Sequence, residues 1–152
     1  MMINGALTIG TMDGANIEMY DAVGAENIFI FGMKEQEVYQ LKQNGYNPQE
    51  YYFKNERLKR AVDFLQVGFA GQSFAHIAQY LLTGYGGAPD PYMCLADYED
   101  YMAVHDVMSA LYENREQWNQ KSLMNIAAAG YFSADRSVRQ YATDIWGIEP
   151  IK

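Results

Sequence analysis

The residues that decide the fold lie at the start of the chain and read Asn4-Gly5-Ala6-Leu7-Thr8-Ile9-Gly10-Thr11-Met12-Asp13-Gly14-Ala15-Asn16-Ile17-Glu18-Met19. The apolar run 6–11 predicts a short strand, and Met12 and Asp13 predict a turn before a helix that begins near Gly14. We expect the Asp13 carboxylate to cap this helix, because it can accept hydrogen bonds from unpaired backbone N–H groups of the first turn. The stretch predicts the first half of a strand-helix-strand unit.

A second apolar run, Asn27-Ile28-Phe29-Ile30-Phe31-Gly32, follows after one short helix. Its four consecutive large apolar residues are typical of a strand that is buried on both faces of a parallel sheet. The connection between the two runs is long enough for a compact crossover helix, and such connections are almost always right-handed. We therefore expect residues 1–32 to form one βαβ unit.

From residue 33 onward the apolar spacing is helical. The pattern predicts a helix from Lys34 to Asn44, one that Pro48 opens and that reaches Leu65, one that Ser73 caps, one that Asp97 opens, one around Trp118 to Ile126, and a last one with Ser133 as its N-cap. Residues 84–91 contain three glycines and two prolines and predict a loop between sub-blocks.

These patterns place the chain in the α/β class with mostly helical content. Residues 1–32 are predicted to form the βαβ unit and residues 33–152 a helical segment that packs beside it. A parallel sheet of two strands leaves both edges unpaired and rarely stands alone, so the pattern favours a fragment of a larger protein. We expect the exposed edges, above all the charge-poor strand 28–31, to promote self-association into a homo-oligomer.

The composition excludes several classes of partner. Among 152 residues, 11 are basic and 19 acidic, which gives a net charge of −8. Nucleic acids and anionic membranes require basic patches, so we expect neither as a partner. Cys94 is the one cysteine of the sequence and cannot form an internal disulfide. No apolar run approaches the ~20 residues that cross a bilayer, and we expect a cytoplasmic protein.

No residue of the sequence is a convincing catalyst. The dinucleotide-binding pattern G-x-G-x-x-G is absent, and Asp13, Asn16 and Glu18 do not converge as an oxygen cage for a metal must. His76 and His105 have no partner at metal-ligand spacing and are interpreted as packed or surface side chains.

The aromatic residues at 51–53 are a candidate sugar-binding surface. Tyr51, Tyr52 and Phe53 can be imagined as a platform on which a sugar stacks, but their helical surroundings favour packing in a core or an interface. Cys94 has no basic neighbour in sequence that would lower its pKa, so it is not expected to act as a nucleophile.

The opening stretch resembles the region that follows the cofactor lysine in the α-glucan phosphorylases, the family of glycogen, starch and maltodextrin phosphorylases. Met1 and Met2 stand at two variable positions of that pattern, Ile3 stands where the family has Leu or Met, and Asn4 matches. The lysine itself would lie one residue before Met1. Further segments resemble the family in the family's order, namely 45–52, 96–101, 109–112, 131–136, 141–142 and 145–150.

The resemblance implies the C-terminal part of a two-domain glycosyltransferase of the GT-B type, in which this chain belongs to the second Rossmann-like domain. It implies reversible phosphorolysis of terminal α-1,4 bonds to glucose 1-phosphate by the complete enzyme, with pyridoxal 5′-phosphate as cofactor. The family's cofactor-binding and substrate-binding groups precede this chain. Only Asn4, Gly5 and their neighbours lie close enough along the chain to support the cofactor site indirectly, as the corner between the helix of the lysine and the next strand.

We therefore predict that the 152-residue chain is inactive by itself, holds no catalytic residue and no metal, and binds no pyridoxal phosphate. Its expected partner is the remainder of the phosphorylase chain, and α-glucan and phosphate would bind only to the complete enzyme. Two alternatives remain open: a stand-alone, non-catalytic helical interaction module, and a regulatory or dimerisation piece of the enzyme.

Overall fold

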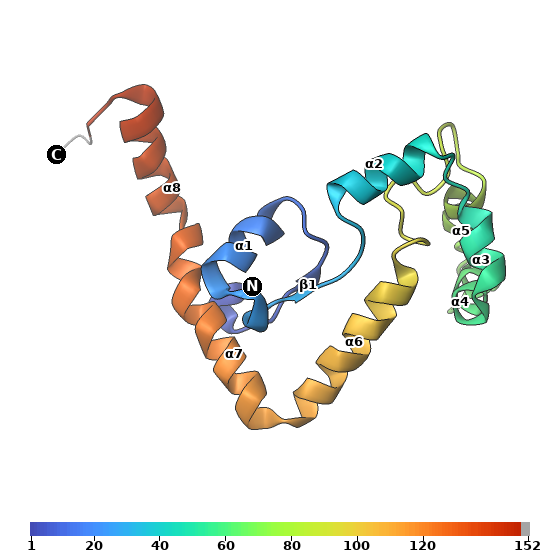
Figure 1. Ribbon diagram of the computed structural model, residues 1–152, viewed down its shortest axis with the longest axis horizontal. Helices are drawn as coiled ribbons and strands as arrows, with labels where there is room; N and C mark the ends of the chain where they lie inside the picture. Colours follow the sequence, from blue (N-terminus) through green and yellow to red (C-terminus); the bar gives the residue numbers. More distant parts are fainter. Residues whose placement is uncertain (150–152) are drawn as a thin grey trace. The chain divides into compact units, whose positions relative to one another are not determined.

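The computed structural model describes residues 1–149 and is mostly helical, with one small parallel sheet of two strands (Figure 1). The chain divides into two compact units. The first contains Met1–Gly10, Gly14–Phe29 and the chain from Val107 onward, and the second contains Thr11–Asp13 and Ile30–Asp106. None of the helices in the described residues combines the length and the apolar composition that crossing a membrane requires.

The first unit begins with the strand-helix-strand arrangement that the sequence predicts. The elements up to the sheet are the 3-10 turn η1 (Met2–Asn4), β1 (Ile9–Gly10), α1 (Ala15–Val23), the 3-10 turn η2 (Ala25–Asn27) and β2 (Phe29–Ile30). Phe29 of β2 belongs to the first unit and Ile30 to the second. The two strands pair with each other, and the backbone N–H of Phe29 donates a hydrogen bond of 2.9 Å to the carbonyl of Thr8.

Both strands are shorter than predicted, and the second is less buried. Phe29 and Ile30 are half-buried, whereas the sequence predicted burial on both faces of the sheet. The physical reason is that a strand extends only as far as a partner pairs with it, and each strand here finds its partner on one side alone within the described residues.

The start of α1 also corrects one prediction. The helix begins at Ala15, close to the predicted position, but its N-cap is Gly14 and no side chain caps it. The Asp13 carboxylate is therefore not the cap. Gly14 has φ +48 and ψ −136, a conformation that favours glycine and turns the chain between Asp13 and the helix.

The rest of the first unit is helical. Helix α6 (Tyr98–Glu113) leads into it, followed by α7 (Arg115–Ala128), η3 (Ala129–Phe132), α8 (Ala134–Tyr141) and a π-helical turn (Ala142–Trp146). The carboxamide of Asn114 accepts from the backbone N–H of Gln117, and the Ser133 hydroxyl accepts from that of Arg136. Ser133 is the N-cap that the sequence predicts for the last helix, and Asn114 starts α7 in the same way.

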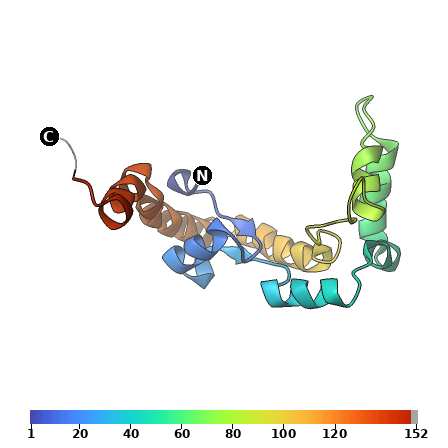
Figure 2. The same cartoon turned by 90° about the horizontal axis from the view of Figure 1, so that it is seen from above.

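The second unit packs α3 (Pro48–Lys54), α4 (Glu56–Val67) and α5 (Ala75–Leu82) around a small apolar core, preceded by α2 (Glu35–Gln43). Figure 2 shows these helices in cyan and green. The core consists of Tyr52, Leu58, Val62, Ala78 and Leu95.

A single helix predicted from Pro48 to Leu65 is two helices in the structure. Asn55 lies between α3 and α4 in an extended conformation, with φ −115 and ψ 109, and its side-chain oxygen accepts a hydrogen bond of 2.9 Å from the N–H of Leu58. The chain thus bends at a residue that competes for backbone hydrogen bonds. No helix or strand is assigned between Leu82 and Tyr98, a stretch that contains the predicted loop 84–91.

Candidate functional site

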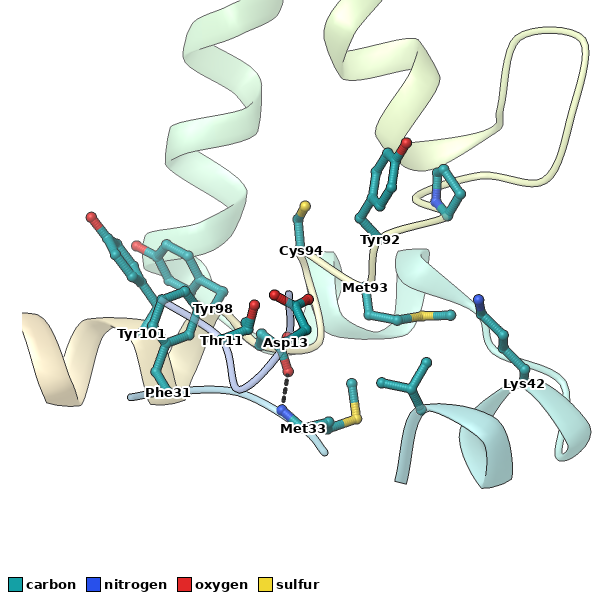
Figure 3. A pocket seen from close by; sticks show the side chains of 13 residues that line it. Thr11, Asp13, Phe31, Met33, Lys42, Tyr92, Met93, Cys94, Tyr98 and Tyr101 are labelled. Atoms are coloured by element: carbon teal, nitrogen blue, oxygen red, sulfur yellow. Dashed lines mark hydrogen bonds between the residues drawn. The ribbon is translucent and has the colours of Figure 1, made fainter. Parts of the chain in front are cut away.

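A cavity of about 590 Å³ lies in the second unit (Figure 3). Residues that directly follow the two strands line one side of it: Thr11 and Asp13 after β1, and Phe31 and Met33 after β2. Parallel strands end at the same edge of a sheet, and ligands in α/β proteins bind at that carboxyl edge. Lys42 of α2, the loop 91–94 and the start of α6 complete the lining.

Two carboxylates at the start of α6 fix the chain that follows β2. The N–H of Met33 donates to Asp97 Oδ1 at 2.9 Å, and the N–H of Gly32 donates to Asp100 Oδ2 at 2.6 Å. Gly32 has φ +82, and a Cβ added there would lie 2.7 Å from Asp97 Oδ2. Only glycine therefore allows this close approach without displacing the carboxylate.

The loop 91–94 is held by Asp90, whose side chain is almost completely buried. Its carboxylate accepts hydrogen bonds from the Tyr46 hydroxyl at 2.7 Å, the Cys94 N–H at 3.0 Å and the Leu95 N–H at 2.8 Å. Asp90 and Met93 have φ values of +41 and +59, which are unfavourable for residues with a Cβ. The hydrogen bonds to Asp90 and the burial of Met93 offset this strain and give the loop one defined conformation.

Burial is the largest cause of the pKa shifts of Asp97, Cys94 and Tyr46. It raises the pKa of the Asp97 carboxyl, opposed in part by the hydrogen bond from Met33. Burial, followed by the nearby Asp90 carboxylate, raises the pKa of the Cys94 thiol. Burial and the hydrogen bond to Asp90 likewise raise the pKa of Tyr46. A thiol with a raised pKa is a poor nucleophile, so Cys94 has no chemistry to offer here.

Asn4 and Gly5, the two residues predicted to support a cofactor site, lie in the first unit. Asn4 is exposed and ends η1, and Gly5 follows it with φ +75. The Ser122 hydroxyl of α7 donates to the Gly5 carbonyl at 2.8 Å, and a Cβ added at Gly5 would lie 2.2 Å from Ser122 Oγ. Gly5 is therefore a close contact point between the start of the chain and α7.

Helix α7 also binds the turn η2, which precedes β2. Asn125, which is 2% exposed, donates through Nδ2 to the carbonyl of Asn27 at 2.8 Å, and Lys121 Nζ donates to the carbonyl of Glu26. The sequence singled out neither Ser122 nor Asn125, because each acts through a contact with a residue far away in the chain. The one signal in the sequence that could have identified them is a polar residue on the apolar face of a helix, because a buried polar side chain needs a hydrogen-bond partner.

The other candidate residues do not meet in one site, although the rings of Tyr52 and Phe53 contact each other edge to face, with 4.8 Å between their centroids. His76 is exposed on α5, and the ring of His105 lies against Tyr101 at 5.7 Å. Tyr52 belongs to the core, with its hydroxyl donating to Asp63 at 2.5 Å, and Phe53 is exposed. In the part of the chain that the structure describes, no three His, Cys, Asp or Glu side chains converge as metal ligands.

Comparison with known proteins decides the family. A family model described as carbohydrate phosphorylase matches residues 1–148. The chain belongs to the carbohydrate phosphorylase family. It is 46% identical to human muscle glycogen phosphorylase over 153 residues and 45% identical to the human brain form over 153 residues. Bovine muscle glycogen phosphorylase is 45% identical over 155 residues.

The phosphorylase match covers this chain almost completely but the relatives only in part. The alignments with the two human enzymes span 98% of this chain and 18% of each relative, and the bovine alignment spans 99% and 18%. The chain therefore corresponds to a segment of a glycogen phosphorylase.

The similarity to glycogen phosphorylases implies that the complete enzyme uses pyridoxal phosphate. The cavity of the second unit does not fit this cofactor. Lys42 is the one lysine of its lining, and Asp13 and Asp97 line the same space. A phosphate group carries negative charge and binds where backbone N–H groups and basic side chains converge, not beside carboxylates. The cavity therefore requires a different interpretation.

Proposed function

We propose that this chain is the C-terminal segment of an α-glucan phosphorylase and that it contributes structure and not catalytic groups. The complete enzyme would cleave terminal α-1,4 bonds of a glucan with orthophosphate and release glucose 1-phosphate. The observation that carries the proposal is the family match over residues 1–148 together with coverage of 18% of the relatives' length. By itself the chain is inactive and binds no pyridoxal phosphate.

The fold supports a place at the edge of a Rossmann-like domain. In this proposal residues 1–32 are the terminal βαβ unit of the second domain of a GT-B enzyme, and residues 33–152 are the helical segment that packs beside it. The two short parallel strands, each paired on one side within the described residues, suit the last strands of a larger sheet.

Helix α7 has a specific task in this proposal. Ser122 contacts Gly5, and Asn125 and Lys121 bind the carbonyls of the turn before β2. The helix thereby fixes both the start of the chain and the entry of the second strand. In the complete enzyme, Asn4 and Gly5 would hold the position of the segment that follows the cofactor lysine without contacting the cofactor.

Two assays of glucose 1-phosphate formation test the proposal. The purified 152-residue chain, supplied with glycogen, orthophosphate and pyridoxal phosphate, should form none, and activity in this assay would contradict the claim that the chain lacks catalytic groups. A chimera of human muscle glycogen phosphorylase, in which residues 1–148 of this chain replace the matching segment, should be active. A folded chimera that retains pyridoxal phosphate but has no activity would contradict the assignment to that position.

The alternative of a helical interaction module rests on exposed apolar side chains. Along α8 and the turn that follows it, Val138, Tyr141 and Ile145 are 54%, 50% and 68% exposed. They recur at the spacing of one helix face, and such a face requires a partner. Light scattering of the purified chain tests the dimerisation form of this alternative: a monomer at high concentration would contradict it.

A further inference from the structure

We propose that the cavity of the second unit is a non-catalytic binding site for a neutral saccharide. This inference goes beyond the proposed function, because it follows from the lining of the cavity and requires no catalytic group. A volume of about 590 Å³ lies within the range of small-molecule sites, and the lining combines aromatic rings with a few polar groups.

Two tyrosines supply the aromatic surfaces. Tyr98 of α6 and Tyr92 of the loop lie on either side of Cys94 and Asp13 in the view of Figure 3. Tyr92 is 80% exposed, although the loop that carries it is fixed by the buried Asp90. A rigid loop that presents an exposed ring is suited to stack on the C–H face of a sugar, a contact between a ring and weakly polar C–H groups.

The polar groups favour a ligand without net charge. Asp13 provides a carboxylate that accepts hydrogen bonds, and Lys42 provides an ammonium group that donates them. The carboxylates of Asp13 and Asp97 disfavour an anion, and the ammonium group of Lys42 offsets part of the attraction that they exert on a cation. A sugar hydroxyl both donates and accepts, so a single class of ligand satisfies groups of both kinds.

The strained loop indicates that this arrangement is preorganised. Asp90 and Met93 adopt unfavourable φ values, and three hydrogen bonds to one buried carboxylate hold them there. Strain of this kind is concentrated at functional sites, where it fixes the geometry before a ligand arrives. A fixed loop reduces the entropy that a ligand loses by ordering its site.

The test is a titration of the purified 152-residue chain, followed by chemical shifts in two-dimensional NMR, with maltotriose and cellotriose as saccharide probes. Choline and inorganic phosphate serve as the cationic and anionic probes. Tyr92→Ala removes the exposed ring and Asp13→Asn removes the carboxylate charge, and both side chains are exposed. Tyr85→Ala is the matched control, because Tyr85 is 77% exposed in the same unit and does not line the cavity.

We expect saccharide binding to shift the resonances of the residues that line the cavity. Tyr92→Ala should weaken this binding about tenfold, because it removes one stacked ring. Tyr85→Ala should leave the binding unchanged. The choice of an α-glucan probe rests on the proposed function. Binding of cellotriose alone would support the site but count against the proposed α-glucan substrate. The inference is overturned if the folded chain binds neither saccharide, binds choline or phosphate in their place, or binds equally well after Tyr92→Ala.

Discussion

Asn125 shows how much of the first unit depends on one side chain. It is 2% exposed, and its Nδ2 group donates to the carbonyls of Asn27 and Lys121, so it pairs a backbone group of the turn before β2 that would otherwise be buried without a partner. An unpaired buried polar group costs more than the hydrogen bond itself contributes. Side-chain hydrogen bonds therefore attach α7 to the turns η1 and η2.

Replacing Asn125 by leucine tests this contact. We expect Asn125→Leu to lower the free energy of unfolding by about 1–3 kcal/mol, because it leaves the Asn27 carbonyl unpaired. Urea unfolding followed by tryptophan fluorescence is the measurement, since Trp118 and Trp146 both belong to the first unit. Asn119→Leu, on the exposed side of the same helix, is the control and should change the stability far less. Equal effects of the two substitutions would contradict the account.

We expect the stability of the folded chain to depend on pH through Asp97. Burial raises the pKa of its carboxyl in the folded chain above the value in the unfolded chain. The folded state therefore binds the proton more tightly, and the stability that this protonation provides is complete below about pH 4 and is lost as the pH rises through the raised pKa.

Asp97→Asn removes this loss, because asparagine stays uncharged and keeps a carbonyl oxygen for the Met33 N–H. The variant should gain stability relative to the native chain between pH 3 and pH 7, measured by urea unfolding at both pH values. An NMR titration of the Asp97 carboxyl carbon should give a midpoint above the ordinary value of about 3.9. A midpoint below that value would show that the hydrogen bond from Met33 outweighs burial.

At the scale of elements, α3 and α4 are separate helices because of Asn55. Its side chain accepts from the Leu58 N–H at 2.9 Å and thereby starts α4, whose Leu58 and Val62 enter the core. Asn55→Ala should lower the stability by about 1 kcal/mol, the usual effect of losing an N-cap. Asn55→Ser keeps an acceptor and should recover most of it. Urea unfolding followed by circular dichroism compares the three chains, and equal losses for alanine and serine would show that Asn55 does not act as a cap.

Local signals in the sequence predicted most of the helices, and the exceptions have physical causes. Ser133 caps α8 as predicted, whereas Asn114, the observed cap of α7, was not singled out as one. The break at Asn55 was missed, since apolar spacing continues across it. The strands were predicted too long because apolar runs reveal the tendency to extend but not which strands are present to pair.

The cavity was not predicted from the sequence at all. It depends on contacts between distant segments, such as the hydrogen bond from Met33 to Asp97, and on a loop whose conformation is set by one buried carboxylate. Asp13 was predicted as a helix cap and instead lines this cavity. Contacts of this kind leave no periodic signal in the sequence. The predicted role of Asn4 and Gly5 in supporting a cofactor site stays a prediction, since it concerns the complete enzyme.

The whole molecule carries apolar surface that suits a segment of a larger enzyme. The apolar stripe on α8 and the turn that follows it is more than half exposed at Val138 and Ile145, whereas α7 packs against η1, η2 and α1. Hydrogen exchange of the purified chain should therefore be faster in α8 than in α7, because exchange follows local stability. Equal protection of the two helices would show that α8 has found a partner, either in the chain itself or in a second copy.

If this chain is a segment of a working phosphorylase, the native polypeptide that carries it should be much longer than the chain itself. An antibody raised against the chain would detect that polypeptide in the cells that make it, and the immunoprecipitate would be assayed for glucose 1-phosphate formation from glycogen and orthophosphate. The account predicts a band several times larger than 17.3 kDa and phosphorolysis by the precipitate. A band at 17.3 kDa alone, with no phosphorolysis, would contradict it and favour the helical interaction module.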